Sequence, residues 1–151
     1  MARDGVATGI DHVELFVTDQ ADAAAWYERV LGFTPDPAFA EWHETGTGPL
    51  VLSVDDGAKL ALFERATATR GAEVSPHRVA FGTDAERFCA FLDRLDTLEL
   101  TDRDGEPVTA ADVVDHRLSY SVYFTDPDGN RLELTTYDYE AVSKELQHRN
   151  E

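Results

Sequence analysis

The sequence predicts an α+β protein made of two tandem βαβββ modules. Three observations predict this fold class. The chain has 151 residues, which is enough for one compact domain with a buried core. A strand-like run followed by an amphipathic helical run occurs twice, beginning DHVELFV at Asp11 and HRVAFGT at His77. Further strand-like segments that bend at a glycine follow each helix. With His12 and His77 taken as equivalent, the two copies are offset by 65 residues.

The first module begins with the strand DHVELFV and continues into the helix TDQADAAAWYERVLGF. Thr18 or Asp19 can cap the start of this helix, and Gly32 can end it in the left-handed conformation. The segment LVLSVDDGAKLALFE then supplies more strand. The apolar residues expected to pack under the sheet are Trp26, Tyr27, Leu31 and Phe33.

The second module repeats this order. Asp84 can cap the helix DAERFCAFLDRL, and YSVYFTDPDGNRLELTTYD reads as two strands around a Pro and Gly turn. A terminal helix follows at 137–148, and 67–75 reads as the linker between the copies. The predicted organisation is one domain over residues 1–151, with modules at about 9–66 and 76–138 and a C-terminal helix at about 138–148.

Composition excludes several partners. The chain has 30 acidic and 13 basic residues, only two of them lysine, and a formal net charge of −17. Nucleic acids and anionic membranes reward clustered positive charge, so neither is an expected partner. No apolar run approaches the roughly 20 residues of a membrane span, and MARDGVATG lacks a signal-peptide pattern, which predicts a cytoplasmic protein. The acidic, lysine-poor surface resembles proteins of high-salt cytoplasm. A single cysteine, Cys89, excludes an internal disulfide and predicts a buried thiol.

The turn and strand YFTDPDGNRLEL resemble the last strands of the vicinal oxygen chelate superfamily, and the resemblance extends over residues of about 9–138. That superfamily holds glyoxalase I, extradiol dioxygenases, fosfomycin-modifying thiol transferases and bleomycin-binding proteins. The resemblance implies that the two modules curl into a half-open barrel around a divalent metal. It also implies a small-molecule substrate and a homodimer.

Glu133 is a candidate site residue because it is a carboxylate on the final strand of the second module. Leu132 and Leu134 share one face of the final strand, so Glu133 lies on the other face. The resemblance implies that His12, His77 and Glu133 are the metal ligands. Two imidazoles and one carboxylate suit Fe(II) or Mn(II), and Zn or Ni is also compatible. From the residues alone, two structural histidines and a solvated glutamate remain an open alternative.

A fourth carboxylate ligand would indicate glyoxalase I. Aligning the two Gly-containing turns places Ala61 at the position of Glu133, and alanine cannot ligate. Glu64 lies three residues further on, so regular alternation turns it to the opposite face unless a bulge intervenes. This departure favours the branches with three ligands, dioxygenase and thiol transferase.

Three other residues are candidate catalytic groups. Glu14 shares the face of His12 and is a candidate general acid or base, with a rim carboxylate as the alternative. Tyr123 lies ten residues before Glu133, where the resemblance implies a substrate-contacting tyrosine. His116 lies in a DH-x-x-S stretch similar to one in ring-cleaving members, where a histidine contacts bound oxygen or substrate.

The leading functional prediction is therefore an extradiol dioxygenase-like oxidoreductase that acts on a small vicinal diol. The alternatives are a glyoxalase-like lyase or fosfomycin-type thiol transferase, and a bleomycin-resistance-type binding protein. The transferase requires a basic cavity. Arg78 and Arg131 are the nearest cations to the predicted site, and with the 65-residue offset Arg78 is expected to face away from the metal.

Overall fold

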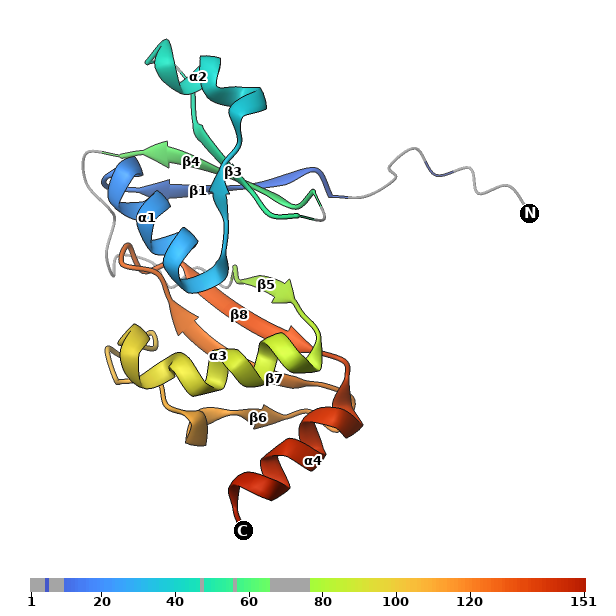
Figure 1. Ribbon diagram of the computed structural model, residues 1–151. Helices are drawn as coiled ribbons and strands as arrows, with labels where there is room; N and C mark the ends of the chain where they lie inside the picture. Colours follow the sequence, from blue (N-terminus) through green and yellow to red (C-terminus); the bar gives the residue numbers. More distant parts are fainter. Residues whose placement is uncertain (1–4, 6–9, 47, 56, 66–76) are drawn as a thin grey trace. The chain divides into compact units, whose positions relative to one another are not determined.

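The computed structural model describes Gly5 and residues 10–46, 48–55, 57–65 and 77–151. The chain divides into two compact units, Met1–Thr69 and Arg70–Glu151. Each unit holds one four-stranded mixed sheet with a helix across one face (Figure 1). The predicted α+β class with two tandem modules is therefore confirmed, whereas the predicted linker at 67–75 lies outside the described residues.

In unit 1 the strand order is β1-β4-β3-β2, with β1 parallel to β4 and the other neighbours antiparallel. Its strands are β1 (His12–Val17), β2 (Thr34–Pro35), β3 (Leu50–Ser53) and β4 (Lys59–Glu64). Its helices are α1 (Gln20–Leu31), the 3-10 turn η1 (Pro37–Phe39) and α2 (Ala40–Glu44). Asp19 caps α1 by accepting a hydrogen bond from the Asp22 amide, and Gly32 ends it at a φ of 83°. Of the predicted core residues, Tyr27 and Phe33 are buried.

Unit 2 repeats this topology with the order β5-β8-β7-β6. Its strands are β5 (Val79–Gly82), β6 (Val114–Asp115), β7 (Tyr120–Thr125) and β8 (Arg131–Thr136). Its helices are α3 (Ala85–Leu98), the 3-10 turn η2 (Ala110–Asp112) and α4 (Tyr139–Arg149). Asp84 caps α3 as predicted, by accepting from the Arg87 amide. Cys89 on α3 is half-buried, and this burial raises the pKa of its thiol.

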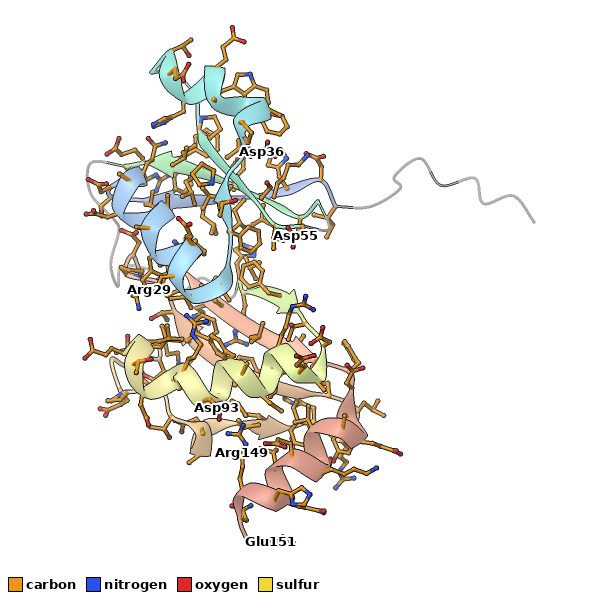
Figure 2. The ribbon with its side chains drawn as sticks, viewed as in Figure 1. Arg29, Asp36, Asp55, Asp93, Arg149 and Glu151 are labelled. Atoms are coloured by element: carbon orange, nitrogen blue, oxygen red, sulfur yellow. The ribbon has the colours of Figure 1, made fainter. Side chains whose placement is uncertain are left out.

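The terminal helix α4 is held on unit 2 by three kinds of contact. Val142 is fully buried. The ring of Tyr139 stacks on that of Tyr120, with centroids 4.7 Å apart. Figure 2 shows Arg149 pointing toward Asp93 of α3, and the guanidinium lies 2.9 Å from its carboxylate. No helix in the part of the chain that the structure describes is long and apolar enough to cross a membrane.

Each sheet has one face covered by its helix and one open face. In β8, residues alternate between buried leucines and half-buried Arg131, Glu133 and Thr135. In β1, buried Leu15 and Val17 alternate with exposed residues. Glu133 therefore stands on the open face of the unit 2 sheet.

The strand registers correct the alignment of the two modules. Val13 pairs with Leu60 in unit 1, and Val79 pairs with Leu132 in unit 2. Because Leu60 and Leu132 are equivalent in the two modules, Val79 corresponds to Val13. The offset is 66, one more than the distance from His12 to His77, and the residue equivalent to His12 is Arg78. The expected equivalence of the two histidines is wrong, because a slip of one residue turns every side chain to the other face.

Candidate functional site

His12 lies at the start of β1 between two carboxylates. Its Nδ1 lies 2.9 Å from Asp11 Oδ2, and its Nε2 lies 3.5 Å from Glu14 Oε1. Lys59 on the neighbouring strand binds the other oxygen of Asp11 at 3.0 Å. Because the carboxylate of Asp11 can only accept, Nδ1 carries the proton, and in the neutral ring Nε2 presents its lone pair.

The electrostatics of this group follow from its hydrogen bonds. The hydrogen bond from His12 and the nearby ammonium of Lys59 hold the pKa of Asp11 below its usual range. The same hydrogen bond to Asp11 raises the pKa of His12 above its ordinary value. Asp11 is therefore ionised at neutral pH and fixes the orientation of the imidazole ring.

Glu133 lies on β8 and is positioned by β7. The hydroxyl of Ser121 donates to Glu133 Oε2 at 2.9 Å, which fixes one oxygen of the carboxylate. Tyr123 is the direct cross-strand partner of Glu133, so both side chains project from the open face. The structure thus brings together Glu133 and Tyr123, as the sequence predicted.

His116 lies within hydrogen-bonding distance of Tyr123. Its Nε2 lies 2.8 Å from the phenol oxygen of Tyr123, and the two rings meet edge to face. Arg78 approaches the same tyrosine from β5, with its guanidinium 4.6 Å from the ring centroid. The expectation that Arg78 faces away from the site is wrong, and the 66-residue offset explains its placement.

A small open cavity of about 160 Å³ adjoins Tyr123. Its cationic lining consists of Arg78, Arg103 and Arg131, and the other lining residues are Asp102, Asp104, Tyr123, Phe124 and Thr125. The carboxylate of Asp102 already accepts from two backbone amides of its own turn. None of the three guanidinium groups forms an ion pair with the residues that the structure describes. Sequence reasoning missed Arg103, because its turn is remote from the site in sequence.

The predicted metal ligands are divided between the units: His12 lies in unit 1, and His77 and Glu133 lie in unit 2. His77 is exposed and directly precedes Arg78, which takes the repeat position of His12. A guanidinium has no lone pair to offer a metal. Within either unit by itself, the described residues contain no group of three His, Cys, Asp or Glu side chains arranged for a metal ion. An imidazole lone pair, as on His12, and a carboxylate, as on Glu133, are each donors of the kind that divalent cations accept.

The strand register of unit 1 shows whether Ala61 or Glu64 takes the position of a fourth ligand. Ala61 is buried and shares its sheet face with its register partner Glu14, and its methyl side chain has no atom that can bind a metal. The register from Lys59 to Glu64 is regular, without a bulge. Glu64 therefore faces the other way, as alternation predicted.

Comparison with known proteins identifies the family. The family model described as "Glyoxalase/Bleomycin resistance protein/Dioxygenase superfamily" matches residues 9–134. Metallothiol transferase FosB of Lysinibacillus sphaericus (strain C3-41) is 30% identical over 128 residues, which are 84% of this chain and 81% of FosB.

Solved structures share the fold. A glyoxalase/dioxygenase from Nostoc punctiforme has a TM-score of 0.69 at 19% identity, over 91% of this chain and 96% of that one. The fosfomycin resistance protein FosX of Mesorhizobium loti has a TM-score of 0.60 at 21% identity, over 87% and 93%. The members of the matched family are mostly metal-dependent enzymes. This chain belongs to the Glyoxalase/Bleomycin resistance protein/Dioxygenase superfamily, also called the vicinal oxygen chelate superfamily.

Proposed function

We propose that the protein is a metal-dependent enzyme that transfers a thiol to a small anionic substrate, in the manner of a metallothiol transferase. The observation that carries this proposal is the cavity beside Tyr123, which gathers three arginines in a chain of net charge −17. The 30% identity to FosB supports it. The three arginines outnumber the two aspartates of the lining, which disfavours a bleomycin-type cationic ligand at this cavity.

The cavity suits the anionic end of such a substrate. Guanidinium groups bind phosphonate or carboxylate oxygens with two parallel hydrogen bonds. The volume of about 160 Å³ is smaller than the roughly 300 Å³ at which typical ligand sites begin, so the cavity takes one head group rather than a whole substrate. We assign Arg78 and Arg131 to this head group.

The reacting end of the substrate lies toward Glu133 and Tyr123 in this proposal. For an epoxide substrate such as fosfomycin, a carbon–sulfur bond forms while the epoxide carbon–oxygen bond breaks, and the thiol proton ends on the new hydroxyl. The phenol of Tyr123, hydrogen-bonded to His116, is placed to donate a proton to that oxygen and to recover one through the imidazole.

A divalent metal would supply Lewis-acid activation of the substrate oxygen. The sequence predicts His12, His77 and Glu133 as its ligands. Iron or manganese is the predicted metal, with zinc or nickel as alternatives. Homodimerisation stays a prediction.

The extradiol dioxygenase reaction is the second candidate, and the contact between His116 and Tyr123 favours it. A hydrogen-bonded imidazole and phenol beside Glu133 could shuttle protons for a metal-bound diol as well as for an epoxide. A neutral catechol, however, makes no use of the arginines.

The two candidates are separated by assaying the full chain with both substrate classes. Protein loaded with Mn²⁺ is incubated with fosfomycin and either cysteine or glutathione, and the adduct is measured by mass spectrometry. In parallel, protein loaded with Fe(II) is given a panel of catechols in an oxygen electrode. Adduct formation that needs both metal and protein supports the proposal. Oxygen uptake with no thiol adduct would replace it with the dioxygenase.

A further inference from the structure

We infer that Tyr139, on the C-terminal helix α4, is a positioning residue for His116 and acts on it through Asp115. The inference rests on the proposed function, since it concerns the imidazole that serves the phenol of Tyr123 there. All the contacts involved lie within unit 2. They lead from α4 through a carboxylate on the edge strand β6 to the turn that carries His116.

His116 needs support of this kind because packing does not hold its side chain. The residue is exposed and lies in the turn between β6 and β7. Its Nε2 lies 2.8 Å from the phenol oxygen of Tyr123, and the two rings meet edge to face. An exposed side chain keeps much of its rotational freedom, so the backbone position decides how often the two groups meet.

The backbone at His116 forms a tight turn that one carboxylate stabilises. The His116 amide donates to the carbonyl oxygen of Ser119 at 2.9 Å, which closes the turn. Arg117, inside the turn, has a φ of 70°, a left-handed conformation that residues with a side chain rarely adopt. Its amide donates to Asp115 Oδ1 at 2.7 Å. Asp115 therefore holds the chain in this unfavourable conformation directly beside His116.

The second oxygen of the same carboxylate is held by α4. The hydroxyl of Tyr139 donates to Asp115 Oδ2 at 2.9 Å. The hydrogen bond from the Arg117 amide and then that from Tyr139 lower the pKa of Asp115, so the carboxylate is ionised at neutral pH and accepts both. With one oxygen bound to the turn and the other to the helix, this carboxylate has little freedom to rotate.

Tyr139 is itself fixed, which makes it a suitable anchor. Its ring stacks on that of Tyr120, with centroids 4.7 Å apart and planes inclined by 10°. Tyr120 is buried and is the cross-strand partner of Asp115, and its hydroxyl lies 2.8 Å from that of Ser143 on α4. The stacked ring keeps its place without its hydroxyl, so Tyr139→Phe removes the hydrogen bond and leaves α4 docked.

The test measures the imidazole directly and does not depend on turnover. Nitrogen-15 NMR of the histidine rings is recorded on the full chain at a fixed pH of about 8, where a free imidazole is neutral. Loss of one signal in His116→Asn identifies that residue among the five histidines. Tyr123→Phe gives the shift caused by loss of the phenol partner. Tyr139→Phe should move the His116 signal in the same direction by a smaller amount, and Asp115→Ala should move it at least as far as Tyr139→Phe.

Tyr137→Phe is the matched control, because this exposed tyrosine lies just before α4 and undergoes the same chemical change. It should leave the His116 signal in place. If Tyr139→Phe also leaves the signal in place, or if Tyr137→Phe moves it equally, the inference is overturned. It is also overturned if Asp115→Ala has no effect, since the carboxylate would then not be the link.

A second readout separates this inference from the proposed function. In thiol transfer, Tyr139→Phe should lower kcat roughly tenfold, below the range of about 10²- to 10⁴-fold that general acid–base catalysis supplies, and should change KM by less than about twofold. A raised KM with an unchanged kcat would contradict the inference, because the arginines of the cavity should not respond. A parent that transfers no thiol would refute the proposed function, whereas the NMR comparison would still decide what positions His116.

Discussion

Removing the guanidinium of Arg78 should weaken anion binding about tenfold. The guanidinium stands 4.6 Å over the Tyr123 ring and lines the cavity with two other arginines. A hydrogen bond to a charged group contributes about 1.5–3 kcal/mol, and about 1.4 kcal/mol changes a dissociation constant tenfold. Arg78 is exposed, so screening by water and salt places the effect at the lower end of this range.

The assay is calorimetric titration of methylphosphonate into the parent and the Arg78→Ala variant at low ionic strength. Arg78→Lys should give an intermediate dissociation constant, since it keeps the charge and loses the two-pronged geometry. Lys144→Ala removes one positive charge from the exposed side of α4 and is the matched control. If Arg78→Ala binds within twofold of the parent, or if Lys144→Ala weakens binding equally, the cavity is not the anion site.

Three further predictions concern the framework of the two units. Val142→Ala should lower the free energy of unfolding by about 2 kcal/mol in urea titrations, because it deletes two fully buried methyl groups; a loss below about 0.5 kcal/mol would mean that α4 is not docked. Gly129→Ala should cost about 1–2 kcal/mol, because Gly129 has a φ of 87°. Gly82→Ala, which also meets open space but lacks a positive φ, should cost less than about 0.5 kcal/mol, and equal losses would refute the backbone explanation. The hydrogen bond to Asp115 raises the pKa of Tyr139 from 10.0 to about 12. The unfolded chain therefore loses this proton first, and stability should fall between pH 10 and 12. Tyr139→Phe should remove that part of the decline in alkaline unfolding curves, and an unchanged decline would contradict the assignment.

Much of the fold could be predicted because its signals are local. Asp19 and Asp84 cap the two long helices, and the glycine turns separate the strands, as predicted. The short elements β2, β6 and α2 were not predicted, because two to five residues carry too little periodicity to be recognised. The open face of β8 was predicted correctly from two leucines alone.

The candidate site could be predicted only in part. Glu133, Tyr123 and His116 were singled out from the sequence, and the structure brings them together within unit 2. Arg103 was missed, because the loop that brings it to Tyr123 leaves no pattern near either residue. The face of Arg78 was predicted wrongly for a different reason. The prediction aligned His12 with His77, whereas the strand registers align the apolar residues Val13 and Val79.

The sequence by itself determined the class, the repeated module, the caps at Asp19 and Asp84 and the faces of β1 and β8, because these depend on neighbours within one turn or one alternation. Only the tertiary structure decided which residues of the two modules are equivalent and which cations meet beside Tyr123. Register is set by hydrogen bonds between strands far apart in the chain, and a shift of one residue exchanges the two faces of a strand. For this protein that single residue decides whether His77 or Arg78 takes the position equivalent to His12, and the guanidinium of Arg78 lies over the ring of Tyr123, the cross-strand partner of Glu133.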